Sequence, residues 1–503
     1  MLQKRSRVWT VLGIFSFLIL LFIHMFYDFH TLYISFTRYS LWDAVSLFSV
    51  PFAGFENYEI FFSSNSGLLA LRNSLMFGVL TALVTTAITV PLVLGLNRLK
   101  NVFLRYGIAG LLFFPFLMTE PMLISFFVSF LSNPQNYNIV LSVFIIVVYK
   151  SIILVPFLVL LSLIVGQVFP IKEGRFILFS IVSAIGIGWF FGVNGSIFPG
   201  FLLDGVRGRE LTDTLAMFAN REALMTMSSR PLATVANLIS DILSGIVLLP
   251  AGIAAAFLLP FSSQAEKPKE KNPVLSILAI PGILFFLILF IIGLIGGSMP
   301  PAELDRHLSS GNIIQTILVV ITPIFGVILG IGLAGLIGQG KMSARIFLIL
   351  SLLLLLPSGT TAATDYYFQV FFKSTSGNFP IFEVSLCALI PALFIGLYLQ
   401  GKKKNPLRIF FMSLSSYFFL VVLFFFLPQK SFLLHNTMFQ SFSAYHATDI
   451  RTQLNLGLSL PNDLPFLTDK IFAFLIPTFF LILAIFLLIL AMRDSKKDLP
   501  KTL

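Results

Sequence analysis

The stretch NSLMFGVLTALVTTAITVPLVLGLNR at residues 73–98 decides the fold of this chain. It carries no charge before its last residue, and it exceeds the roughly 20 apolar residues that a helix needs to cross about 30 Å of hydrocarbon. The whole chain has 57% apolar residues, 58 Phe residues and a mean hydropathy of +0.95. This composition excludes a soluble globular protein.

Stretches of comparable length recur along the whole sequence. Their continuous hydropathy favours helices, because the strands of an outer-membrane barrel show weaker, alternating polarity. We therefore predict an all-α, polytopic membrane protein with about twelve transmembrane helices. The expected spans are 8–27, 70–97, 103–131, 138–168, 175–202, 231–262, 274–298, 310–338, 344–372, 379–400, 406–427 and 467–492.

The distribution of Lys and Arg predicts how these spans are oriented. Most of these residues lie in the segments 1–7, 98–105, 171–176, 263–274, 339–346, 401–408 and 493–503. By the positive-inside rule, these segments and both termini are cytoplasmic, and a bacterial inner membrane is the expected location. The net charge of +11 then reflects orientation and contact with anionic membrane lipid, so we expect no nucleic-acid partner.

Few residues have the chemistry of a metal site or a covalent catalyst. Cys387 is the only cysteine, so the chain has no internal disulfide. The five histidines are scattered, without the spacing of a helical ligand pair, and no nucleotide-binding Walker motif occurs. We therefore expect no catalytic residue, no metal and no cofactor, and we predict that the chain is not an enzyme.

A charged segment, FSSQAEKPKEKN, separates Pro260 from Pro273 and divides the chain into two halves. We predict a first half at 1–262, a cytoplasmic linker at 263–273 and a second half at 274–503, with six spans in each half.

The two halves also resemble each other. Asn73 precedes Pro115 by 42 residues in the first half, and Asn312 precedes Pro357 by 45 residues in the second. Each half starts and ends on the same side of the membrane. We therefore predict a fused repeat whose halves are parallel and related by an axis along the membrane normal.

Four segments of the first half carry a resemblance to a known family. They are FAGFENYEIFF at 52–62, RNSLMFGVLTALVTTAITVPLVLGLNRL at 72–99, RYGIAGLLFFPFLMTEP at 105–121 and TLAMFANREAL at 214–224. Together they resemble the membrane subunits of maltose-type sugar importers of the ABC transporter class, and the second half resembles the companion subunit more weakly. The resemblance implies a fused carbohydrate permease that works with an external ATPase and a substrate-binding protein.

The chain departs from this family at the cytoplasmic loop that grips the ATPase. In the family, a helix bearing Glu-Ala-Ala lies in this loop. Here only IKEG separates GQVFP at 166–170 from RFILFSIVS at 175–183, and GKKKNP alone follows Gln400 in the second half. A docking helix of two or three turns needs roughly 10 residues. Both coupling loops are therefore missing, and we expect no conventional docking of an ATPase subunit.

Lys150 is the cation that lies deepest within a predicted span. An ammonium at this depth costs roughly 2.5–3.5 kcal/mol on insertion scales, so we expect it to face protein. It either lines a translocation path or forms a structural pair with a carboxylate or with helix-end carbonyls. The candidate carboxylates are Glu120, Asp241, Asp365 and Glu383.

The loops on the non-cytoplasmic side are the candidate partner surface, with 203–230 and 428–466 as its main parts. The first of these retains four arginines against the positive-inside trend, namely Arg207, Arg209, Arg221 and Arg230. Positive charge there suggests a periplasmic or envelope protein partner.

Two functions are compatible with these features. The first is a permease-like subunit of a carbohydrate importer. The alternative is a degenerate permease fold without ATPase coupling, which serves as a membrane scaffold in a larger envelope complex.

Overall fold

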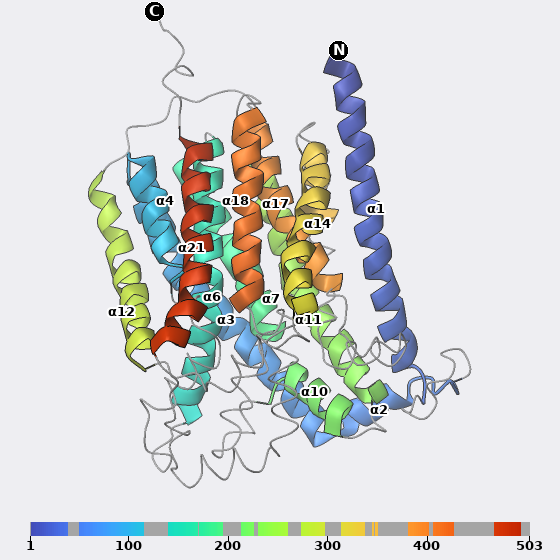
Figure 1. Ribbon diagram of the computed structural model, residues 1–503. Coiled ribbons are helices and arrows are strands. Elements are labelled where there is room, and N and C mark those ends of the chain that lie inside the picture. Colours follow the sequence, from blue (N-terminus) through green and yellow to red (C-terminus); the bar gives the residue numbers. More distant parts are fainter. Residues whose placement is uncertain are drawn as a thin grey trace, which may run out of the picture.

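The computed structural model describes residues 2–38, 50–114, 139–169, 171–194, 213–225, 230–259, 273–296, 313–337, 345–346, 348–350, 381–401, 406–426 and 467–493. Within these ranges the chain is helical, as the hydropathy predicts (Figure 1). The elements are α1 (Leu2–Ser35), α2 (Glu56–Ser63), α3 (Asn65–Arg98), α4 (Val102–Leu111), α6 (Ile139–Val168), α7 (Glu173–Asn194), α10 (Leu215–Met225), α11 (Arg230–Leu258), the 3-10 helix η5 (Pro273–Ala279), α12 (Ile280–Gly296), α14 (Ile313–Ile337), α17 (Ile381–Gly401), α18 (Pro406–Phe426) and α21 (Leu467–Met492).

Four helices in the described part of the chain are long and apolar enough to cross a membrane. They are α3 and the stretches Ile146–Val168 of α6, Glu173–Val193 of α7 and Pro231–Leu258 of α11. Shorter apolar helices lie in α1, α4, α12, α14, α17, α18 and α21, and each overlaps a range expected for a span. The molecule is therefore a helical, membrane-embedded protein, and twelve spans stay a prediction.

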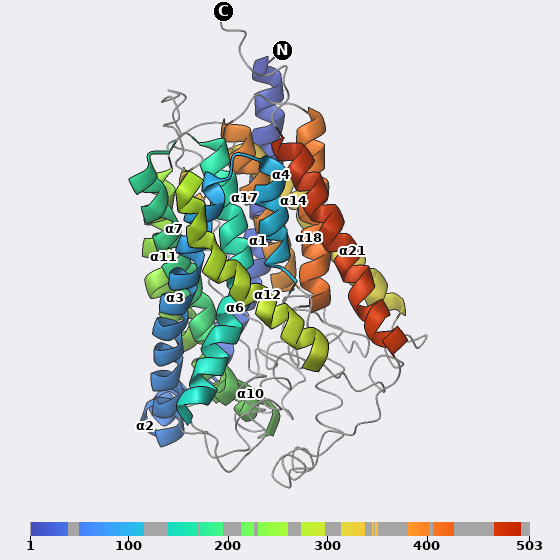
Figure 2. The ribbon, with the colours of Figure 1, turned by 90° about the vertical axis from the view of Figure 1, so that its left-hand side faces the viewer.

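The two ends of the helix bundle differ in what they carry (Figures 1 and 2). The described chain begins and ends at the same end, where α1 starts at Leu2 and α21 stops at Met492. We call this end the terminal face. The short helices α2 and α10 lie at the other end, which we call the opposite face.

One hydrophobic core runs through both halves of the sequence. It includes Leu163 of α6, Phe176 of α7, Leu333 of α14 and Tyr398 of α17. In the first half, α3 contacts α6 and α7, and α7 contacts α11. In the second half, α14 contacts α17 and α18, and α18 contacts α21. The order of neighbours therefore corresponds between the halves.

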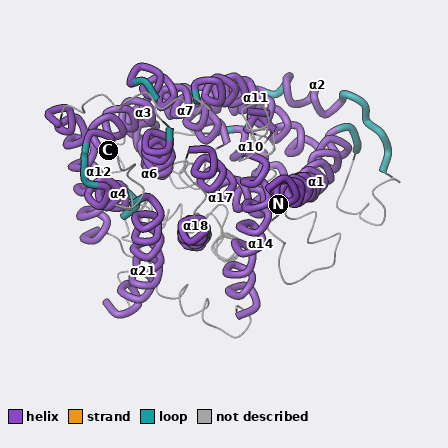
Figure 3. The backbone as a smooth tube through the Cα atoms, turned by 90° about the horizontal axis from the view of Figure 1, so that it is seen from above, coloured by secondary structure: helices purple, strands orange, loops and turns teal. Residues whose placement is uncertain are grey.

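Each half also packs its first helix against the other half (Figure 3). α1 packs against α14, and η5 and α12 pack against α3. Both contacts use small residues: a Cβ added at Gly13 would lie 2.7 Å from the Gly332 carbonyl oxygen, and one added at Gly95 would lie 2.6 Å from the Ala279 Cβ. Small residues let membrane helices approach closely and gain van der Waals contact. The exchange joins the halves into one body.

The turn between α6 and α7 is short. α6 ends at Val168 and α7 begins at Glu173, so only residues 169–172 connect them. Arg98 at the end of α3 forms an ion pair with Glu173 and holds the start of α7. In the second half α17 ends at Gly401 and α18 begins at Pro406, with 402–405 outside the described residues. Neither connection has room for a coupling helix, as the sequence predicted.

The motif GFENY, which begins at Gly54, fastens the end of α1 to the start of α2. Gly54 has a φ of +60°, a backbone conformation that other residues adopt only with strain. The Nδ2 atom of Asn57 donates hydrogen bonds to the carbonyl oxygens of Ser35, at 2.8 Å, and Thr37, at 2.9 Å. The Tyr58 and Ser35 hydroxyls lie 2.8 Å apart. The segment that carries part of the family resemblance thus has a structural role in this chain.

Replacing Asn57 with Ala should destabilise the protein. The change leaves two carbonyl groups near the end of α1 without their donor, and it should lower the free energy of unfolding by about 1–3 kcal/mol. The thermal midpoint of the purified chain in detergent measures this loss. The control is the same change at Asn65, which is exposed at the start of α3 and should have little effect. Equal midpoints for the two variants would contradict the capping role.

Candidate functional site

Lys150 lies where α3, α6 and α7 meet. Its side chain is 5% exposed, and its Nζ donates a hydrogen bond of 2.9 Å to the carbonyl oxygen of Gly192 in α7. The same ammonium lies 5.1 Å from the ring centroid of Phe77 in α3, within the range of a cation–π contact. A helix-end carbonyl is one of the partners that the sequence analysis allowed for this cation.

The Gly192 carbonyl is available because α7 ends at Asn194. The last four carbonyl groups of a helix have no partner within the helix, and their dipoles favour a cation. α3 lies directly behind this position, since a Cβ added at Gly192 would be 2.6 Å from the Phe77 carbonyl oxygen and 2.7 Å from the Gly78 Cα. Lys150 therefore caps the end of α7 at a close crossing of α3 and α7.

Polar residues of α3 hold the start of α10 on the opposite face. Asn73 donates from Nδ2 to the carbonyl oxygen of Asp213 at 2.9 Å, and the Ser74 hydroxyl accepts a hydrogen bond from the Leu215 amide at 2.9 Å. Both α3 side chains are fully buried. The Asn73 that marks the sequence repeat is thus a structural contact in the first half.

A row of buried hydroxyls continues along α3. Thr81, Thr85 and Thr89 follow at intervals of four residues, which places them on one face of the helix, and each is fully buried. The Thr85 hydroxyl donates to the Ser151 hydroxyl of α6 at 3.1 Å. The hydroxyls of Thr81 and Thr89 have no hydrogen-bond partner. This row gives one buried face of α3 a polar character.

The other candidate residues from the sequence are spread over the chain. Asp241 is half-buried in α11. Glu383, Arg221 and Arg230 lie in α17, α10 and α11, and only their helical backbone is described. The remaining candidates, Glu120, Asp365, Arg207 and Arg209, lie outside the described residues, as does the expected surface at 428–466.

Part of the expected partner surface at 203–230 is internal packing. Leu215, Phe218 and Ala219 of α10 are buried in a small hydrophobic cluster with Phe61 of α2 and with the first turns of α11. The Phe61 and Phe218 rings meet edge to face, with centroids 5.4 Å apart. The apolar residues of this helix therefore hold the opposite face together.

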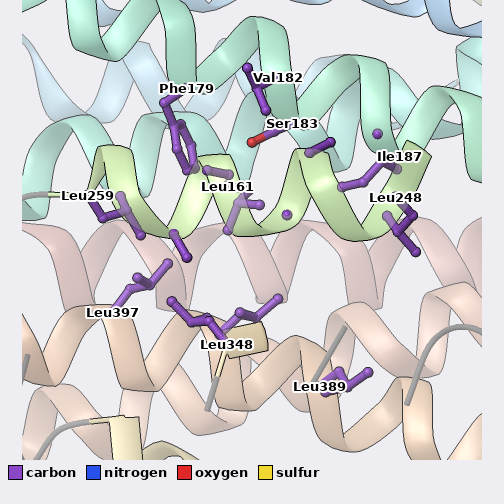
Figure 4. Close-up of a pocket in the computed structure, with 16 residues that line it drawn as sticks. Leu161, Phe179, Val182, Ser183, Ile187, Leu248, Leu259, Leu348, Leu389 and Leu397 are labelled. Carbon is purple, nitrogen blue, oxygen red and sulfur yellow. The ribbon is translucent and has the colours of Figure 1, made fainter. Parts of the chain in front are cut away.

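A cleft of about 120 Å³ lies between α7 and α11 on one side and α17 on the other (Figure 4). Its walls are Leu, Ile, Val, Phe, Ala and Gly, and Ser183 is the only lining residue with a polar side chain. It therefore combines residues of both sequence halves. A sugar needs several hydrogen-bond partners, and this lining suits hydrocarbon better.

Sequence reasoning missed two polar residues that act at the terminal face. Gln167 donates from Nε2 to the carbonyl oxygen of Met492 at 2.8 Å, so α6 caps the end of α21. Arg105, which is 5% exposed, donates from Nε to the Leu99 carbonyl oxygen, just after α3, at 3.2 Å. Both are polar residues near the ends of predicted spans, Gln167 within 138–168 and Arg105 within 103–131, and this position is the signal that the sequence offered.

The chain was compared with known families, proteins and structures. No protein-family model matches the sequence, and neither curated proteins nor solved structures give a match. The resemblance to importer permeases therefore rests on the sequence segments quoted above. Among the described residues, no group of three or more His, Cys, Asp or Glu side chains is placed to hold a metal ion.

Replacing Lys150 with Met should lower stability and leave partner association intact. Met has a similar length, so the loss concerns the contacts of the ammonium, including those with the Gly192 carbonyl and the Phe77 ring, and we expect about 1–2 kcal/mol less free energy of unfolding. Thermal unfolding in detergent measures it, with the same change at exposed Lys172 as the control. An unchanged midpoint together with altered transport would instead make Lys150 a pathway residue.

Proposed function

We propose that this chain is a membrane scaffold with the fold of an importer permease, which holds envelope proteins together and is not driven by an ATPase. The observation that carries the proposal is the four-residue turn between α6 and α7. The family places its ATPase-docking helix at the corresponding loop. A turn of residues 169–172 alone cannot form such a helix, so an ATPase has no element through which to move the transmembrane helices.

Two further features support a scaffold. The exchange of α1 and α12 between the halves opposes the rocking of one half against the other on which alternating access depends. The cleft between the halves is almost entirely apolar, which does not suit a hydroxyl-rich substrate.

A fused carbohydrate permease with an external ATPase is the second candidate. The buried hydroxyls of Thr81, Thr85 and Thr89 favour it, because a row of hydroxyl groups along one helix has the chemistry of a sugar pathway. This candidate requires an ATPase that grips the short basic turns by another route.

A photo-crosslinking amino acid in place of Lys172 tests the two candidates. Lys172 is exposed on the α6–α7 turn, where an ATPase would dock. In native membranes we expect no crosslink from this position to a nucleotide-binding protein. The matched position is Glu59, which is exposed in α2 on the opposite face and should crosslink to envelope proteins. A stoichiometric crosslink from Lys172 to a nucleotide-binding subunit would establish the permease instead.

Reversal of Arg207 and Arg209 to Glu tests the partner surface predicted from the sequence. The double change should weaken association with envelope partners, and more strongly at low salt, because exposed charges are screened beyond about 8–10 Å at physiological ionic strength. Affinity purification from native membranes at two salt concentrations measures it. An unchanged set of partners at both concentrations would place the interface on another part of the molecule.

A further inference from the structure

The geometry of the cleft between α11 and α17 points to a lipid site, independent of the proposed scaffold function. We propose that it holds one acyl chain of an anionic phospholipid from the leaflet at the terminal face, with the phosphate beside Arg345. Three properties of the described residues carry this inference: the length of the cleft, the chemistry of its walls and the position of the guanidinium at its end.

The cleft is long and runs parallel to the helices. Leu248 and Leu389 lie at one end, and Leu259 and Leu397 lie at the other (Figure 4). From Leu248 to Leu259 the path is about 16 Å, because an α-helix rises about 1.5 Å per residue. One leaflet contributes about half of the 30 Å hydrocarbon thickness of a bilayer. The cleft thus has the length and direction of a lipid chain that crosses one leaflet.

The walls of the cleft match hydrocarbon. Apart from Ser183, every lining side chain is apolar. The volume of about 120 Å³ is close to that of an engineered apolar cavity of about 150 Å³ that stays dry and takes up benzene, so the cleft encloses a segment of the acyl chain that lies along it. Interiors of proteins are otherwise packed to high density, so a void of this size forfeits contacts unless an apolar molecule fills it. At hydrocarbon depth the surrounding lipid is the available occupant.

The end of the cleft at Leu259 and Leu397 carries a positive charge. The Arg345 guanidinium lies over the Phe257 ring, 4.9 Å from its centroid. Phe257 is two residues before Leu259, and Arg345 is three residues before Leu348, and both of these leucines line the cleft. A lipid whose tail enters the cleft from this end therefore places its phosphate near Arg345.

This end of the cleft lies toward the terminal face. α6 and α11 reach that face at their last residues, and the Gln167 contact with Met492 places the end of α6 beside the end of α21. Other cations of the described chain lie at the same ends of helices, including Arg98 and Arg493. Basic residues between membrane helices on one face are typical of sites for anionic head groups.

Native mass spectrometry of the full chain tests the proposal. The delipidated protein in detergent is titrated with dioleoyl phosphatidylglycerol, and we expect one tightly bound molecule. Replacing Ala255, which lines the cleft, with Leu should weaken that binding at least tenfold, because the added side chain fills the space of the acyl chain. The matched control is the same change at Ala254, the adjacent exposed residue, which should bind as the wild type does.

Two further variants separate the tail from the head group. Leu393→Phe fills the cleft from α17 and should also weaken binding. This second variant keeps the test valid if Ala255→Leu does not fold. Arg345→Gln should remove the preference for phosphatidylglycerol over phosphatidylcholine, while Arg493→Gln should keep it. Thermal midpoints confirm that each variant is folded.

Wild-type binding by both cleft-filling variants would overturn the proposal. The proposal would also be overturned if millimolar inorganic phosphate displaced the lipid while the cleft-filling variants still bound it as the wild type does. Arg345 would then bind a free anion.

Discussion

A helix that ends in or near hydrocarbon leaves four carbonyl groups without partners, and no water is there to receive them. In this molecule polar side chains from neighbouring elements meet that need. Asn57 serves the end of α1, Arg105 the end of α3, Lys150 the end of α7 and Gln167 the end of α21. Each donor satisfies a carbonyl group that the helix itself leaves without a partner.

This constraint changes how polar residues in the spans are to be read. A buried charge in a membrane helix usually suggests transport, because the charge is expensive to keep. Lys150 meets that description, yet its ammonium is held by a helix-end carbonyl and an aromatic ring. Asn73 likewise supports the start of α10. In the described first half these two polar groups stabilise the bundle.

The sequence predicted the all-helical fold and the short α6–α7 turn, because hydropathy and loop length are local properties. It placed the end of the first span near residue 27, whereas α1 continues to Ser35. Asn57 of the next helix donates to carbonyl oxygens at this end, and such a cap leaves no mark in the sequence of the span itself. The burial of Lys150 could be predicted from the free energy needed to place an ammonium in hydrocarbon. Its particular partner could not be predicted, since a backbone carbonyl such as that of Gly192 has no signature in a sequence. The cleft depends on tertiary packing between helices far apart in the chain.

The packing of α1 against α14 has a consequence for biogenesis. Gly13 and Gly332 meet in this contact, although α1 ends at Ser35 and α14 begins only at Ile313, so α1 is synthesised long before α14. During synthesis the face of α1 that carries Gly13 therefore has no final neighbour until much of the second half has entered the membrane. A chain truncated at the linker would therefore expose the surface of α1 that α14 covers in the complete protein. Cellular quality control could recognise the truncated chain by this surface.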